Sequence, residues 1–110
     1  MTVKELTEKL NLQVVAGADG LDKEILGGYT SDLLSDVMGH AEAGFVWITL
    51  QTHKNVLAIA SLKELSAIVL VKGFKAEQEM IDQANEENIA VLSTTMSTFD
   101  INGAIYNLLK

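Results

Sequence analysis

Apolar residues occur in short continuous blocks along this chain, separated by polar and glycine-containing stretches. Three blocks in the second half, residues 45–50, 67–71 and 89–92, show almost no polar alternation. Strands of a parallel sheet that is covered by helices on both faces have this continuous pattern. We therefore interpret the three blocks as buried parallel strands.

Helical spacing of apolar residues follows each of these strands. Residues 56–65 suit a packed helix, residues 75–88 form an acidic amphipathic pattern, and Ser97 precedes a final apolar helix. The second half is thus predicted to alternate strand and helix. Right-handed crossovers would bring the carboxyl ends of its strands to one edge of the sheet.

The first half is predicted to start with a short helix, because Thr2 and Glu5 have the spacing of a capping box. Apolar runs at residues 12–16 and leading into residues 27–32 predict two further strands. A short helix capped by Ser31-Asp32 follows. Residues 1–110 are thus expected to form one domain with an α/β fold, a three-layer α/β/α sandwich. Its sheet would be mostly parallel and mixed at one edge.

The charge balance excludes several partners. The formal net charge is −7, and all eight basic residues are lysines. A protein that reads a phosphate backbone needs a basic face and usually arginine, so neither nucleic acid nor an anionic membrane surface is an expected partner. The lack of arginine also argues against phosphoryl transfer, in which arginine is a common stabiliser of transition-state charge.

Cysteine is absent, which removes disulfides, thiolate nucleophiles and Cys-based metal sites, and the two histidines have no zinc-ligand spacing. We therefore expect no metal and no cofactor. No apolar window approaches the about 20 residues that span a membrane. Residues 1–10 are charged and helix-like, without the apolar region of a signal peptide, so a cytoplasmic location is expected.

Polar side chains gather where the predicted strands end, which is where open α/β sheets bind ligands and where helix N-termini offer N–H groups to anions. An alternative explanation is structural: Asp32, Thr52 and Ser97 would be helix N-caps. Both interpretations fit the pattern. The candidate ligand-binding residues are Gly28, Thr30, Ser31, Asp32, Thr49, Gln51, Thr52, His53, Ser93, Thr94 and Thr95.

His53 is the candidate for acid–base chemistry in this set, because an imidazole titrates near neutral pH. Catalysis would also need a partner within hydrogen-bond distance, for which Asp32 or Thr94 would serve if folding brings it close. The sequence shows no activated nucleophile. No residue is therefore assigned a catalytic role.

Several segments together resemble the DRTGG domain family, which is similar in fold to the N-terminal domain of HPr kinase/phosphorylase. The Asp-Arg-Thr-Gly-Gly string that names the family does not occur, and its nearest counterparts are His53-Lys54 and Lys72-Gly73. The resemblance rests on residues 15–17, 28–32, 49–53, 67–73 and 88–94.

The resemblance implies a regulatory module. Domains of this family usually accompany others, such as CBS pairs, a pyrophosphatase or a phosphotransacetylase, and their role there is dimerisation or signal relay. The leading hypothesis is a non-catalytic regulatory module that forms a homodimer and senses a small anionic or nucleotide-type metabolite. One alternative is a small enzyme that uses His53 with Asp32 or Thr94 on an acyl or phosphoryl substrate. Another is a structural module that binds a protein partner.

Overall fold

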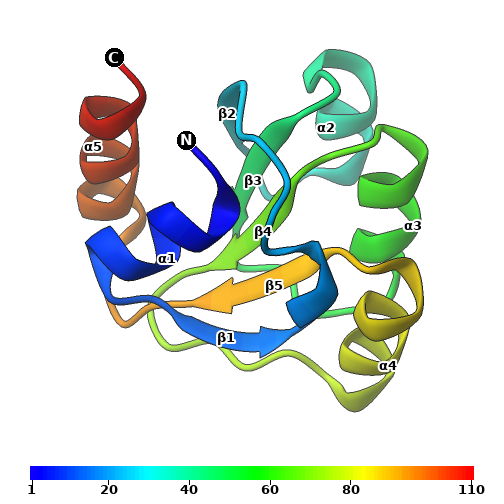
Figure 1. Ribbon diagram of the computed structural model, residues 1–110. Helices are drawn as coiled ribbons and strands as arrows, with labels where there is room; N and C mark the ends of the chain where they lie inside the picture. The colour runs from blue at the N-terminus through cyan, green and yellow to red at the C-terminus, as the bar shows by residue number, and fades with distance from the viewer.

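Five strands form a single sheet in the computed structural model, which describes residues 1–110 (Figure 1). Their order across the sheet is β1-β5-β4-β3-β2. Strands β2 to β5 are parallel, and β1 is antiparallel to β5, so the predicted parallel sheet with one mixed edge is confirmed. The strands are β1 (Gln13–Ala16), β2 (Gly27–Thr30), β3 (Phe45–Thr49), β4 (Ala67–Leu70) and β5 (Ala90–Ser93).

Helices cover both faces of the sheet. One buried cluster joins α2, α3 and α4 to one face, and a second joins α1 and α5 to the other, which confirms the three-layer α/β/α arrangement. None of the helices has the length and apolar character that crossing a membrane requires. They are α1 (Val3–Leu10), α2 (Leu34–His40), α3 (Asn55–Leu62), α4 (Gln78–Glu87) and α5 (Thr98–Leu109), with a 3-10 turn η1 (Ala18–Gly20) after β1.

Side-chain alternation along β3 explains why its first four residues are all apolar. Val46 and Ile48 belong to the cluster under α1 and α5, whereas Trp47 between them belongs to the cluster under α2, α3 and α4. Successive strand side chains point to opposite faces, so a strand with two covered faces buries every position. All four residues of β4 are buried for the same reason. Each large aliphatic side chain buried in this way contributes roughly 1.5–3 kcal/mol.

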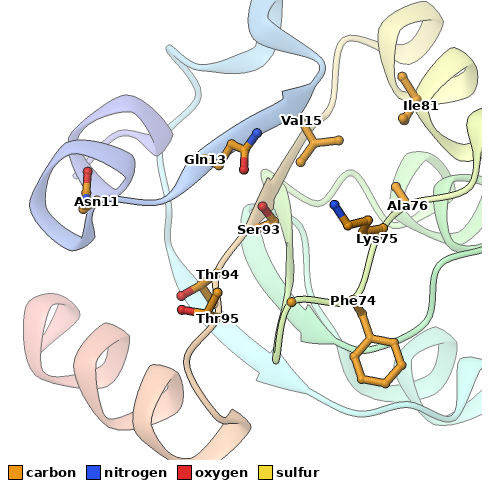
Figure 2. A pocket seen from close by; sticks show the side chains of 11 residues that line it. Asn11, Gln13, Val15, Phe74, Lys75, Ala76, Ile81, Ser93, Thr94 and Thr95 are labelled. Carbon is orange, nitrogen blue, oxygen red and sulfur yellow. The ribbon is translucent and has the colours of Figure 1, made fainter.

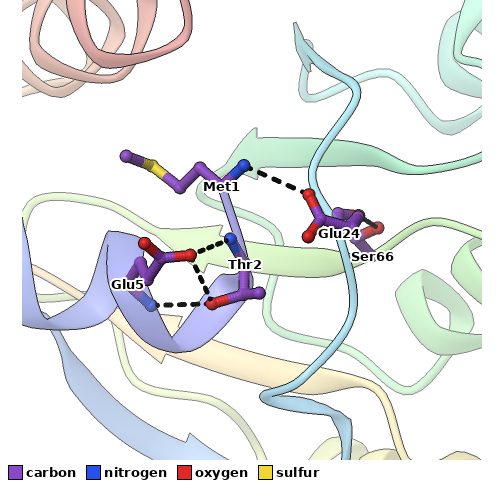
Figure 3. Close-up of polar contacts among 5 residues, drawn as sticks. All are labelled: Met1, Thr2, Glu5, Glu24 and Ser66. Atoms are coloured by element: carbon purple, nitrogen blue, oxygen red, sulfur yellow. Dashed lines mark hydrogen bonds and ion pairs between the residues drawn. The ribbon is translucent and has the colours of Figure 1, made fainter.

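Two of the predicted N-caps are confirmed. The Thr2 hydroxyl accepts a hydrogen bond from the Glu5 N–H, and the Glu5 carboxylate accepts one from the Thr2 N–H (Figure 3). The Glu5 carboxylate accepts hydrogen bonds from the Thr2 N–H and, at 3.2 Å, from the Thr2 hydroxyl, and these two bonds, the backbone one first, hold the pKa of Glu5 below its usual value. Ser97 caps α5 by accepting a hydrogen bond from the Asp100 N–H at 3.1 Å.

The caps predicted at Asp32 and Thr52 are wrong. Helix α2 follows Leu33 and α3 follows Lys54, and neither helix has a side-chain cap. The predicted start of α4 is also three residues too early, since Glu77 has an extended backbone and donates its N–H to the Thr52 carbonyl at 3.0 Å. Residues 75–77 therefore belong to the loop between β4 and α4.

Candidate functional site

The predicted polar clusters all lie at the carboxyl edge of the sheet. The register pairs Thr49 with Leu70 and Leu70 with Ser93, so the parallel strands end level with one another. Strand β1 runs the opposite way and brings Gln13 beside Ser93. The clusters nevertheless separate into two groups: those after β2 and β3 bond to each other, and the one after β5 lines a cavity.

Asp32 joins the ends of β2 and β3. Its Oδ1 atom accepts hydrogen bonds from the Thr49 hydroxyl at 2.8 Å and from the Leu50 N–H at 2.9 Å. The Gln51 side-chain amide donates to the Asp32 backbone carbonyl at 2.9 Å. Thr49 is only 1% exposed, and an unpaired hydroxyl there would cost about 1–3 kcal/mol. These hydrogen bonds therefore hold the ends of β2 and β3 together, through Asp32, Thr49 and Gln51.

The predicted site residues that precede Asp32 in the chain lie on or next to β2, and two of them make hydrogen bonds to other parts of the fold. The Ser31 carbonyl accepts a hydrogen bond from the Trp47 indole N–H at 2.8 Å. The Thr30 hydroxyl donates to the Asn102 side chain of α5 at 2.6 Å. Gly28 is exposed on β2, which is an edge strand of the sheet. These positions fasten β2 to its neighbours, and none of them lines the cavity described below.

A second polar cluster links β2 to α2. The Tyr29 hydroxyl donates to the Asp36 carboxylate at 2.9 Å, and His40 Nδ1 lies 3.1 Å from the same carboxylate with its ring stacked on that of Tyr29. Hydrogen bonds from Ser31 and Tyr29 hold the pKa of Asp36 below its usual value, and the bond to Asp36 raises the pKa of Tyr29. The cluster fixes α2 against the edge of the sheet.

His53 pairs with a different carboxylate from the one considered in the sequence. Its Nδ1 atom lies 2.6 Å from Glu77 Oε2, and both side chains are more than half exposed, at 61% and 54%. No hydrogen bond or ion pair joins His53 to Asp32 or Thr94. The pair ties the loop after β3 to the start of α4. The enzyme alternative needs a His–Asp or His–Thr contact, and the geometry does not provide it.

A cavity of about 590 Å³ lies beside the carboxyl end of β5 (Figure 2). Small-molecule sites have volumes of roughly 300–1,000 Å³. Of the predicted site residues, only Ser93, Thr94 and Thr95 contribute to it. The complete lining consists of Asn11, Gln13, Val15, Gly73, Phe74, Lys75, Ala76, Ile81, Ser93, Thr94 and Thr95.

Lys75 gives this cavity its charge. Its side chain extends from the loop after β4 toward Ser93 (Figure 2). No carboxylate lies among the lining residues, and Lys75 takes part in none of the ion pairs of the protein. An ammonium group without a carboxylate partner, next to three hydroxyl-bearing residues, is suited to binding an anion.

The loop that carries Lys75 is held in a fixed conformation. Lys72 and Gly73 both have positive φ angles, 57° and 73°, a backbone region that costs residues other than glycine about 1–2 kcal/mol. Their N–H groups donate to the Met96 and Thr94 carbonyls in the loop after β5, at 2.9 Å each. These two bonds connect the loops on either side of the cavity, so the cavity is formed before any ligand binds.

Three polar residues of the lining are not identified from the sequence. The pattern predicts Lys75 inside a helix, and its position soon after a buried strand was the signal that could have placed it at the sheet edge. Asn11 and Gln13 reach the cavity because β1 is antiparallel to β5 and begins at that edge. No cluster of three or more His, Asp or Glu side chains that could hold a metal ion occurs in the structure.

Comparisons with known proteins were consistent with one another. The sequence model of the DRTGG domain family matches residues 5–108. Similar curated proteins are the HPr kinase/phosphorylase of Streptococcus thermophilus, 28% identical over 119 residues, and that of Streptococcus uberis, 27% identical over 121 residues. These alignments cover 94% and 96% of this chain but 38% and 39% of the relatives, so the chain spans about two fifths of their length.

A solved structure shows the same fold. It contains the CBS and DRTGG domains of the regulatory region of Clostridium perfringens pyrophosphatase, complexed with the activator diadenosine tetraphosphate. The TM-score is 0.71 at 14% sequence identity, over 94% of this chain and 45% of that one. The agreement in fold is therefore much closer than the agreement in sequence.

Proposed function

This chain belongs to the DRTGG domain family, and we propose that it is a non-catalytic regulatory module in which residues 1–110 act as one domain. In this proposal it binds a small anionic or nucleotide-type metabolite in the cavity beside Lys75. The observation that carries the proposal is the cavity of about 590 Å³ with a lysine that has no carboxylate partner.

The chemistry of the lining supports an anionic ligand. The protein is acidic, with a formal net charge of −7, yet this cavity contains a lysine and no acidic residue. Ser93, Thr94 and Thr95 add hydroxyl donors, and a charge-assisted hydrogen bond is roughly twice as strong as a neutral one. The regulatory region of the Clostridium perfringens pyrophosphatase was crystallised with a nucleotide activator, which makes nucleotides the first probes to test.

Isothermal titration calorimetry with AMP, ATP, diadenosine tetraphosphate and inorganic phosphate tests the binding claim. We expect at least one of these probes to bind, and Lys75→Ala to raise its Kd about ten- to hundredfold, because a hydrogen bond to a charged group contributes about 1.5–3 kcal/mol. The matched control is Lys63→Ala, a lysine that follows α3 and does not line the cavity. An unchanged Kd in Lys75→Ala, or no binding of any probe at millimolar concentration, would contradict the proposal.

We also propose that the module forms a homodimer through the exposed side of α5. Phe99 and Tyr106 are 86% and 65% exposed on this helix. They are seven residues apart, about two helical turns, so they lie on one side of it. Exposed aromatic residues are enriched in the cores of protein interfaces.

Sedimentation velocity over a concentration series tests the dimer. We expect Phe99→Ser to raise the dimer dissociation constant about thirtyfold, the equivalent of the about 2 kcal/mol of an interface hot spot. Leu62→Ser is the matched control, since Leu62 is 68% exposed on α3. A wild-type protein that sediments as a monomer at high concentration would remove the dimer from the proposal.

A further inference from the structure

The cavity supplies one positive charge. Lys75 is the only charged residue in its lining, and the chain contains no arginine. Its side chain extends toward Ser93, whereas the Phe74 ring points away from the cavity (Figure 2). An anion held here would therefore meet one ammonium group and a set of neutral hydroxyl and amide groups.

Neighbouring charges do not complete a polyphosphate site. Lys54 is paired with Glu79 at 3.1 Å at the start of α4. Lys72 lies in the same loop as Lys75 but does not line the cavity. Each further phosphate group would add negative charge to a complex of an already acidic protein, without another lining cation to offset it.

Part of the lining is apolar and needs a matching ligand surface. Val15 of β1, Ala76 of the loop after β4 and Ile81 of α4 line the cavity. They pack against the buried cluster under α2, α3 and α4. In Figure 2, Val15 and Ile81 lie on the opposite side of the Lys75 ammonium from Thr94. A bare phosphate ion would leave this apolar surface in water, whereas a ligand with an apolar body would cover it.

We propose that the cavity selects a ligand with a single acidic group and an apolar body, in the class of the nucleoside monophosphates. This inference rests on the proposed binding function and specifies which class of ligand the cavity prefers. The acidic group pairs with Lys75 and the Ser93 hydroxyl, and the apolar body lies against Val15 and Ile81. Nucleoside polyphosphates bind more weakly because of their uncompensated charge, and inorganic phosphate binds more weakly because it has no apolar body.

Calorimetric titration with AMP, ADP, ATP and inorganic phosphate at one ionic strength, in buffer with EDTA, tests the order of affinities. We expect the Kd to rise about threefold with each phosphate added to AMP, the size of a Coulomb interaction between unit charges about 7 Å apart in water. Inorganic phosphate should bind at least about tenfold more weakly than AMP. Lys75→Ala should weaken AMP binding, and Lys72→Ala, a lysine of the same loop, should leave it within about twofold.

The outcomes separate this inference from the proposed function. If ATP binds more tightly than AMP in metal-free buffer and loses that affinity in Lys75→Ala, the single-charge inference is wrong and the binding function stands. If Lys72→Ala weakens AMP binding as much as Lys75→Ala does, the site has a second cation and the inference is again wrong. If none of the probes binds, the proposed function fails and this inference fails with it.

Discussion

Replacing Gly17 by alanine is expected to lower the free energy of unfolding by about 3 kcal/mol. Gly17 has a φ of 71°, and a Cβ atom there would overlap the Ile89 carbonyl oxygen and lie 2.8 Å from the Ala90 nitrogen. Both are backbone atoms, so no side-chain rotation relieves the overlap. The Gly17 N–H also donates to the Asn85 side chain at 2.8 Å, and moving the turn away would break that bond.

Urea unfolding followed by circular dichroism measures this loss. The matched control is Gly39→Ala on α2, where nothing lies within 4 Å of the added Cβ. Alanine in place of glycine inside a helix is expected to raise stability by about 0.5–1 kcal/mol. A Gly17→Ala variant as stable as the wild type would show that the turn after β1 does not pack on β5 in this way.

Replacing Trp47 by alanine is expected to cost about 3–5 kcal/mol, the usual range for a large aromatic residue truncated in a core. Trp47 is fully buried in the cluster under α2, α3 and α4. Its indole N–H also donates to the Ser31 carbonyl at 2.8 Å, so the same side chain holds the turn between β2 and α2. The substitution thus affects the core and the carboxyl edge of the sheet together.

Trp47→Phe separates the two contributions. It keeps an aromatic ring in the core but removes the N–H donor, and we expect it to cost about 1–3 kcal/mol. Urea and thermal unfolding, followed by circular dichroism because the indole fluorophore is lost, measure both variants. Equal stability of Trp47→Phe and Trp47→Ala would mean that ring packing contributes little, contrary to the complete burial of this residue.

The sheet could be predicted because its signal is local. Residues 67–70 are apolar at every position since both faces of β4 are covered, and this pattern is visible in the sequence. The capping box at Thr2 and the cap at Ser97 are equally local, because the bonded groups are three residues apart. Such features depend on neighbours in the chain.

The predicted caps at Asp32 and Thr52 fail for a tertiary reason. Asp32 has the residue type of an N-cap, but its carboxylate instead accepts hydrogen bonds from the Thr49 hydroxyl at the end of β3 and from the Leu50 N–H that follows it. The Thr52 carbonyl, and not its hydroxyl, makes the contact to Glu77. Side chains that favour caps also bond to any suitable donor that folding brings near, and sequence spacing does not reveal that competition.

The candidate site likewise has features that follow from local sequence and features that depend on tertiary contacts. The sequence by itself determined the parallel α/β core, the shared edge at which its polar strand ends gather, and the placement of Ser93, Thr94 and Thr95 there. Only the tertiary structure decided that these three residues line one cavity with Lys75, while Asp32 and His53 serve other contacts. The physical reason is that hydrophobic periodicity fixes which elements form and which faces they bury. The direction of β1 and the hydrogen bonds between loops, which link residues distant in the chain, fix which polar groups meet.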